Sequence, residues 1–402
     1  MTRPTPSTHP PSREADLLLP TLLFALTLTA VAPAFLVGAF ARDLMDDLGF
    51  RIAELGLVGS MYTVGFGVGA LTGRYLWRGW PPDLALFLPG GVALLGGVVV
   101  ARADSLAALV VGVTLAGVAS SVSQTISTHL IASRPAGSVR AATVFSAFQS
   151  AKPAAAVVVG LLSVIGLSGV GWREVFLAVG VLSVVLVALV QWPTRDQVYA
   201  AEPAGRAITL SRWIWRPTVL MGLGFAITSI STTFIVEAAQ DEGLDARAAG
   251  LVLLGSGCLA VVGRITAGLL ADRPGVSLNR LLAWLFALGG LGCALIATGG
   301  ITSFLVGVCL VFGPGWAFGG VILARVSMHD RARASQSAGA LFLGAALGGA
   351  LGPAAFGLVV AQASYGIAWA GLGVFMLVAG WVALTWRLGQ ADQTGAAHRT
   401  VR

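Results

Sequence analysis

Long apolar runs, each of about 20 residues, follow one another along almost the whole chain of 402 residues. A helix of that length crosses the hydrocarbon core of a bilayer, and a continuous run lacks the alternation of a membrane β-barrel strand. With 56% hydrophobic and 11% charged residues, the chain carries more apolar surface than a soluble core can hide. We therefore expect an all-α integral membrane protein with twelve transmembrane helices, starting near Leu17, Leu55, Leu84, Leu106, Thr143, Val175, Pro217, Gly250, Leu281, Ile301, Ala338 and Ile367.

The arginines are unequally shared between the two sides of these predicted helices. If the N-terminus is inside, eighteen arginines fall on the inner loops and tails and five on the outer loops. Inner loops of membrane proteins carry this excess. The bias predicts a multi-pass protein of the plasma or inner membrane, with both termini in the cytoplasm. It also accounts for the net charge of +7 without a nucleic-acid partner.

The predicted helices divide into two groups of six. The longest polar break, residues 193–213, is expected to be a cytoplasmic linker. It would join an N-terminal six-helix bundle (17–192) to a C-terminal one (214–387). The ends are expected to be a disordered cytoplasmic tail at 1–16 and a second cytoplasmic tail at 388–402.

The two predicted bundles also repeat one another in sequence. The segment GALTGR (Gly69–Arg74) follows the second predicted helix, and GLLADR (Gly268–Arg273) follows the eighth at an offset of 199 residues. Pro153 and Pro353 differ by 200. Internal repeats of this kind are typical of transporters in which two halves rock around a substrate held at their interface.

Two basic residues lie inside apolar runs. Lys152, the only lysine of the chain, is about ten residues into the fifth run, and Arg264 is about eight residues from the inner end of the eighth. A charge at that depth costs ~2.5–3.5 kcal/mol even on lenient scales, so such residues usually face a water-filled cavity or a partner. Because both are positive, we expect them to flank one anionic substrate. The alternative is that each extends to the interface or pairs with a backbone carbonyl.

These features together resemble the major facilitator superfamily over nearly the whole chain. The superfamily's loop signature, Gly-x-Leu-x-Asp-Arg, is present as Gly268, Leu270, Asp272 and Arg273, while the equivalent segment after the second helix has glycine instead of the acid. The resemblance implies a fold of two pseudo-symmetric six-helix bundles that works by alternating access, usually as a monomer.

The segment GRITAGLLADR (Gly263–Arg273) is similar to the eighth helix of the monocarboxylate and oxalate–formate porters. In those families an arginine at this position faces the substrate carboxylate, which implies that role for Arg264. The oxalate–formate group has a second cation in helix eleven, whereas this chain has Lys152 in helix five. The resemblance therefore implies a secondary transporter, a symporter for a small organic anion such as a mono- or dicarboxylate.

Further candidate residues are polar or aromatic side chains in or next to the runs. Two nearby cations repel in a dry site, so Lys152 could take up its proton together with the anion, which makes H+ a candidate coupling ion. The candidate lining residues, each also compatible with helix packing, are Gln149, Gln124, Ser120, Tyr62 and Trp316. The candidates for proton coupling are Glu237 and Lys152. The cytoplasmic gate implied by the resemblance consists of Arg74, Asp272, Arg273, Arg134 and Arg140.

Other functions are less well supported by the sequence. No cluster of acids, histidines or metal ligands shares one depth, so we expect no enzyme, no metal and no cofactor. The single lysine does not follow a glycine-rich phosphate loop, which argues against ATP as the energy source. Two alternatives remain open, namely an efflux transporter for apolar or drug-like compounds and a membrane-embedded sensor or receptor.

Overall fold

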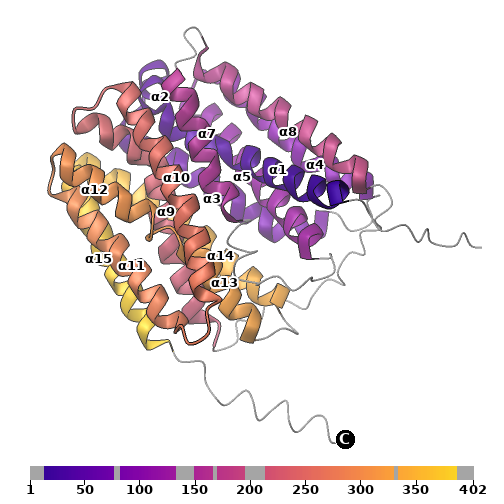
Figure 1. The fold of residues 1–402 in the computed structure, drawn as a ribbon. Coiled ribbons are helices and arrows are strands. Elements are labelled where there is room, and N and C mark those ends of the chain that lie inside the picture. The colour runs from indigo at the N-terminus through magenta and orange to yellow at the C-terminus, as the bar shows by residue number, and fades with distance from the viewer. Residues whose placement is uncertain are drawn as a thin grey trace, which may run out of the picture.

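The described residues form an all-helical bundle (Figure 1). The computed structural model describes residues 13–76, 82–132, 149–165, 170–194, 213–329 and 334–386. Within these ranges the helices are α1 (Arg13–Ala39), α2 (Ala41–Leu48), α3 (Ile52–Leu76), α4 (Pro82–Ala101), α5 (Leu106–Ala132), α7 (Ala151–Ile165), α8 (Trp172–Thr194), α9 (Trp215–Asp241), α10 (Ala246–Ala271), α11 (Leu278–Ala297), α12 (Ile301–Phe312), α13 (Phe318–His329), α14 (Ala334–Gln362) and α15 (Tyr365–Thr385).

The apolar helices agree with the predicted membrane spans. In the described part of the chain, nine helices are long and apolar enough to cross a membrane, and three shorter apolar helices lie at Phe87–Ala101, Ala151–Ile165 and Ile301–Phe312. Each of these twelve segments corresponds to one predicted run, so the structure is compatible with twelve crossings. The all-α membrane fold predicted from the hydropathy is confirmed.

Two of the predicted spans differ in detail from the observed helices. The fifth was expected to start near Thr143, which lies outside the described residues, and α7 begins at Ala151. The tenth was expected to be continuous but is divided into α12 and α13. Pro314 has no backbone N–H, and the amide of Gly315 donates instead to the Leu310 carbonyl at 3.1 Å. The helix therefore ends before this proline and restarts at Phe318.

The helices before and after residue 200 pack in the same pattern. In the first half, α1 packs against α5, α7 and α8, and α4 packs against α8. In the second half, α9 packs against α13, α14 and α15, and α11 packs against α15. Each of these contacts in the first half has a counterpart in the second half, so the predicted pair of pseudo-symmetric bundles is observed. The linker proposed between the bundles lies almost entirely outside the described residues.

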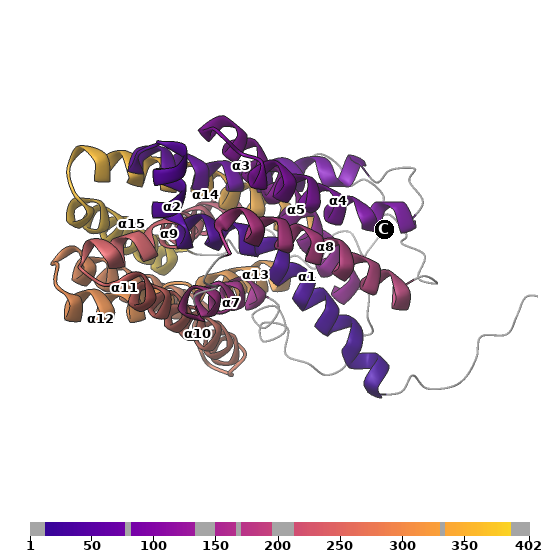
Figure 2. The ribbon, with the colours of Figure 1, turned by 90° about the horizontal axis from the view of Figure 1, so that it is seen from above.

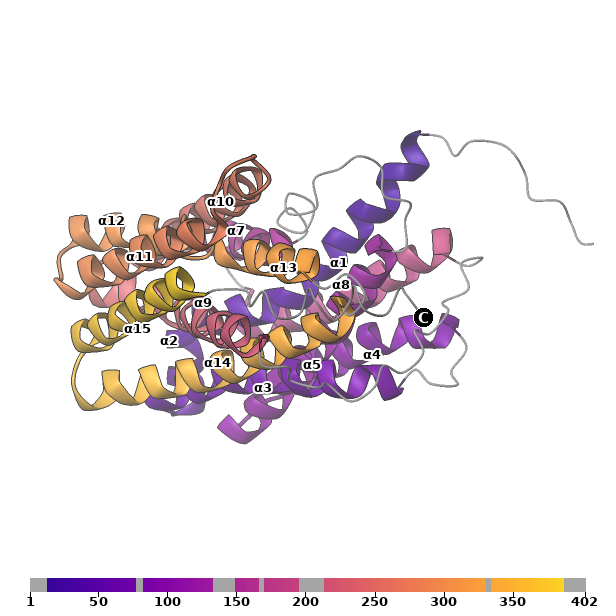
Figure 3. The same cartoon turned by 90° about the horizontal axis from the view of Figure 1, so that it is seen from below.

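The two halves meet along two equivalent seams. Helix α3 packs against α14, and α7 packs against α10, while α1 contacts α9 between them. Figures 2 and 3 show the first half, in indigo and magenta, meeting the second, in orange and yellow, along these helices. We call the end of the bundle that carries α2 the α2 face, and the opposite end, where α1 starts and α15 ends, the terminal face.

Glycines allow the backbones to touch at both seams. A Cβ atom on Gly56 of α3 would lie 2.3 Å from the Pro353 carbonyl oxygen of α14. A Cβ atom on Gly160 of α7 would lie 2.5 Å from the Leu254 nitrogen of α10. Real Cβ atoms do not approach so closely, so these positions need glycine for the close approach typical of small residues at membrane helix interfaces. The glycines lie toward the α2 face, where the two halves are in contact.

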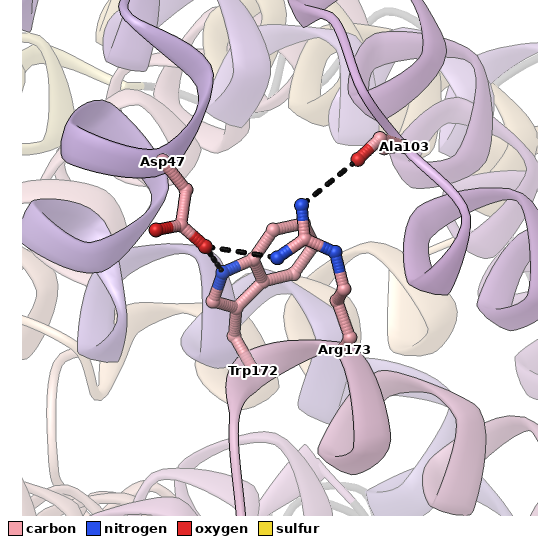
Figure 4. A network of polar contacts seen from close by, with 4 residues as sticks. All are labelled: Asp47, Ala103, Trp172 and Arg173. Atoms are coloured by element: carbon pink, nitrogen blue, oxygen red, sulfur yellow. Dashed lines mark hydrogen bonds and ion pairs between the residues drawn. The ribbon is translucent and has the colours of Figure 1, made fainter.

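A polar network joins three helix ends of the first half at the α2 face (Figure 4). The buried Trp172 donates from Nε1 to Asp47 Oδ2 at 2.9 Å, and Arg173 Nη1 approaches the same oxygen at 2.8 Å. Arg173 also donates from Nη2 to the Ala103 carbonyl at 3.1 Å. Trp172 and Arg173, at the start of α8, therefore fix α2 and the α4–α5 turn relative to α8.

The carboxylate of Asp47 gives this network a pH dependence. The hydrogen bond from Trp172, and then that from Arg173, lowers the pKa of Asp47 below its ordinary value. The stabilisation is fully present above about pH 3.9, the unfolded value, and is lost as the pH falls through the lower folded-state pKa. We expect Asp47→Asn to lower the melting temperature at pH 7, and the difference from wild type to shrink below about pH 4.

Thermal melts of the purified protein between pH 7 and pH 3 measure this effect. Asp46→Asn, at an exposed neighbouring position on the same short helix, is the matched control. A difference between Asp47→Asn and wild type that stays constant over this pH range would contradict the role assigned to the carboxylate.

Candidate functional site

Arg264 lies on α10, the helix of the second half that packs against α7 of the first half. The side chain is buried, with 7% of its surface exposed. It donates from Nε to the Trp316 carbonyl at 3.2 Å and from Nη1 to the Gln149 carbonyl at 2.5 Å. Trp316 belongs to the break between α12 and α13 of the second half, and Gln149 immediately precedes α7 of the first. One guanidinium therefore connects both halves through backbone carbonyls.

The sequence of α7 explains why the Gln149 carbonyl can accept this bond. In an α-helix the carbonyl of residue i accepts from the N–H of residue i+4, and for Gln149 that residue is Pro153. Proline has no N–H, so the carbonyl lacks its helical donor. The next carbonyl, of Ser150, regains the regular pattern with Ala154 at 3.0 Å. Arg264 thus supplies the donor that Pro153 lacks.

Lys152 lies on the first turn of α7, three residues after Gln149. Its Nζ is 4.5 Å from the centroid of the Phe225 ring of α9, which is a cation–π contact between the two halves. The two described ion pairs are Arg42–Glu237 and Arg173–Asp47. Lys152 and Arg264 therefore lie close together around Gln149, and within the described ranges neither pairs with an acid.

These contacts bear on the two interpretations of the buried cations. The sequence favoured an anion between Lys152 and Arg264, with a backbone carbonyl as the alternative partner. In this structure Arg264 does bind carbonyl oxygens, and Lys152 lies over an aromatic ring. Neither contact supplies a negative charge, whereas a carboxylate partner would add an opposite charge and could accept two parallel N–H bonds from the guanidinium.

Three of the predicted lining residues lie in helix packing of the first half. Tyr62 is buried and donates to the Ala30 carbonyl of α1 at 3.3 Å. Ser120 is also fully buried, and Gln124 Nε2 lies 3.4 Å from its hydroxyl oxygen. The first contact connects α3 to α1, and the second lies within α5. The structure therefore places these three residues in helix packing, and a lining role for them stays a prediction.

Trp316 is fully buried next to Arg264. Its ring centroid lies 4.5 Å from that of Phe312 and 6.3 Å from that of Phe35, which belongs to α1 of the first half. The guanidinium carbon of Arg264 is 5.9 Å from the Trp316 ring centroid. The indole packs across the interface, so Trp316 contacts Arg264 both through its backbone carbonyl and through a cation–π contact of its ring.

Glu237 lies apart from the two cations, at the α2 face. It is twelve residues beyond Phe225 on α9, or roughly 18 Å at 1.5 Å per residue. One carboxylate oxygen is 3.6 Å from Arg42 Nη2 of the first half, and the other accepts a hydrogen bond from the hydroxyl of Tyr365 on α15. Glu237 therefore bridges the halves on the side away from Lys152, and its role in proton coupling stays a prediction.

The predicted gate residues lie at the terminal face or outside the described residues. Asp272 ends α10 and Arg273, which is exposed, follows it. The side chain of Arg74 at the end of α3, and the whole of Arg134 and Arg140, lie outside the described residues. Their role in a gate stays a prediction from the sequence signature.

Some residues that shape this region were not predicted as site residues. Phe225, Arg42 and Tyr365 all contact predicted residues from distant helices, and no local pattern marks them. Pro153 differs, because a proline four residues after a polar residue in an apolar run indicates a free carbonyl at membrane depth. Across the described ranges, no group of three His, Cys, Asp or Glu side chains could hold a metal ion.

Comparison with known proteins agrees with this architecture of repeated membrane helices, which defines the molecule as a multi-pass membrane transport protein. The chain matches the Major Facilitator Superfamily over residues 22–353. It therefore belongs to the Major Facilitator Superfamily of membrane transporters, as its loop signature indicated. A comparison with curated proteins gives no match.

Solved structures of a bacterial homolog to the human lysosomal transporter Spinster have a similar fold. One, in an inward-facing and occupied conformation, has a TM-score of 0.68 at 16% identity, with 97% of this chain and 98% of that chain covered. Another, inward-facing and unoccupied, has a TM-score of 0.69 at 14% identity, with 95% and 100% covered. At this level of identity the similarity concerns the fold alone.

Proposed function

We propose that this protein is a secondary active transporter that moves a small organic anion, a mono- or dicarboxylate, across the cell membrane by alternating access. The observation that carries the proposal is the position of Lys152 and Arg264. Lys152 lies on the first turn of α7, Arg264 reaches the Gln149 carbonyl from the other half, and within the described ranges neither forms an ion pair with an acid. A carboxylate between them would give both cations an acceptor of opposite charge.

Arginine is well suited to bind a carboxylate. Its planar guanidinium offers parallel N–H groups that match the two oxygens of a carboxylate, whereas a lysine ammonium acts as a point charge. Arg264 uses Nε and Nη1 for carbonyls in this structure. Lys152 could then neutralise a second carboxylate or the remaining charge. The resemblance of Gly263–Arg273 to the carboxylate porters supports the same substrate class.

We further propose that the structure represents an inward-facing state with the terminal face in the cytoplasm. The glycine contacts between α7 and α10 lie toward the α2 face, and Arg42 meets Glu237 across the two halves at that same face. The excess of arginine on the loops of the opposite side supports a cytoplasmic terminal face. The similar Spinster homolog structures are described as inward-facing.

Uptake into proteoliposomes tests the proposed substrate class. Purified protein reconstituted into tight vesicles is assayed with radiolabelled lactate, oxalate, succinate and benzoate, with choline as a cationic control. We expect saturable uptake of at least one carboxylate and none of choline. Transport of apolar dyes in the absence of any carboxylate uptake would instead support the alternative of an efflux transporter.

The same vesicles test whether a proton accompanies the anion. If Lys152 takes up a proton with each anion, carboxylate uptake alkalinises the external medium, which an external pH indicator measures. We expect Lys152→Gln to abolish this pH change. Glu237→Gln tests the second predicted coupling residue, which lies roughly 18 Å further along α9. Carboxylate uptake without alkalinisation in wild type would rule out proton symport.

A further inference from the structure

We propose that the substrate anion and the Gln149 carbonyl compete for Arg264, so that anion binding releases the contact that holds α7 against α10. The inference rests on the proposed function, because it takes a carboxylate as the competing acceptor. It adds a physical link between occupancy of the site and separation of the two halves. We call the hydrogen bond from Arg264 Nη1 to the Gln149 carbonyl the α7–α10 tie.

The tie exists because of Pro153. Without a donor at residue 153, the Gln149 carbonyl would be an unsatisfied acceptor at membrane depth, and Arg264 is the group that satisfies it. A neutral carbonyl is nevertheless the weaker acceptor. A carboxylate carries the opposite charge and can accept two parallel N–H bonds from one guanidinium, so it can displace the carbonyl. The empty carrier therefore keeps the tie, and the loaded carrier loses it.

Only one of the two seams carries such a tie in the described structure. Pro353 of α14 corresponds to Pro153, but the residue equivalent to Arg264, at the offset of 199, is Gly65 of α3. At that seam the Ser60 hydroxyl accepts a hydrogen bond from the Ala354 amide at 2.9 Å. No charged group takes part in that contact. Substrate occupancy is therefore sensed at the α7–α10 seam and not at its counterpart.

Restoring the missing N–H tests the competition directly. Pro153→Ala gives the Gln149 carbonyl a helical donor, so it should bind Arg264 less well and compete less with the anion. Binding of sodium lactate and sodium oxalate is measured by calorimetry on the purified full chain. Loss of one competing hydrogen bond predicts about fivefold tighter binding. Pro353→Ala, the equivalent change at the seam without an arginine, is the matched control and should bind as wild type does.

A second measurement reports movement of the α7–α10 seam, first in the wild-type sequence. Spin labels at Ile165 and Leu251, both exposed positions near the α2-face ends of α7 and α10, are introduced after replacement of the three native cysteines. Addition of the bound carboxylate should shift the inter-label distances to longer values. Pro153→Ala should show the longer population without the anion.

The outcomes separate this inference from the function on which it rests. Carboxylate binding together with tighter binding by Pro153→Ala and a longer label distance supports the tie. Carboxylate binding that is equal in wild type and Pro153→Ala, or that leaves the label distance unchanged, overturns the tie while the transporter proposal stands. If neither lactate nor oxalate binds to wild type and uptake is also absent, the proposed function fails and the inference fails with it.

Discussion

Replacing Arg264 by glutamine should reduce carboxylate uptake at least about 30-fold. Removing one partner of a buried charged pair costs about 2–5 kcal/mol, and 2 kcal/mol corresponds to roughly 30-fold in affinity. Glutamine removes the charge and keeps an N–H donor at about the position of the arginine Nε, so the Trp316 carbonyl retains a partner and the fold is preserved. The effect should therefore appear in anion recognition. Initial rates of uptake over a range of substrate concentrations measure it.

A control on the same helix makes this result specific. Arg247→Gln removes an exposed arginine near the α2-face end of α10 and should transport at the wild-type rate. Both variants are compared at equal amounts of monodisperse protein in the vesicles. Normal carboxylate uptake by Arg264→Gln would remove the basis for an anionic substrate and leave Arg264 with a purely structural role between the halves.

Replacing Gly257 by valine should also reduce transport, by a different route. A Cβ atom at this position of α10 would lie 2.7 Å from the Val157 nitrogen and 2.9 Å from the Pro153 carbonyl oxygen of α7. Both are backbone atoms, so the clash cannot be relieved by a rotamer change. Overpacking typically costs about 1–3 kcal/mol, and this cost falls on the state in which the seam is closed. The variant should fold but favour an α7–α10 seam that is open toward the α2 face.

A second glycine of α10 provides the control for Gly257→Val. Gly255→Val lies two residues earlier on α10, where a Cβ atom would meet nothing within 4 Å. This control should transport normally, whereas Gly257→Val should lose at least about fivefold, as a shift of about 1–3 kcal/mol in the equilibrium implies. Labels at Ile165 and Leu251 measure the seam in both variants. Equal transport and equal label distances would show that the close packing at Gly257 is dispensable.

The parts of the fold that depend on hydropathy alone could be predicted from the sequence. Each apolar run became an apolar helix because a chain in lipid must satisfy its backbone hydrogen bonds within the segment. The repeat of Gly69–Arg74 at Gly268–Arg273 likewise indicated two equivalent halves. The break in the tenth span was less evident, although Gly313, Pro314 and Gly315 are residues that end helices.

The partners of the site residues could not be predicted from the sequence. Arg264 stands out because a charge in an apolar run is unusual, but its acceptors lie 115 and 52 residues away in the chain. Glu237 and Tyr365 are separated by 128 residues. Such contacts depend on how the two halves meet, and a single sequence carries no local signal of that. Tyr62 illustrates the same limit, because a polar group in a span faces either a cavity or a neighbouring helix.

The ion pair between Arg42 and Glu237 has a consequence for how the α2 face opens. The Arg42 side chain is 50% exposed and that of Glu237 is 12% exposed, so solvent reaches the pair from the arginine side. A pair with one solvent-exposed partner contributes about 1 kcal/mol or less, and dissolved salt weakens it further. The energetic barrier to opening at this face thus arises mainly from dispersion contacts along the glycine-lined helices. Turnover should consequently respond more to temperature and to the lateral pressure of the surrounding lipid than to ionic strength.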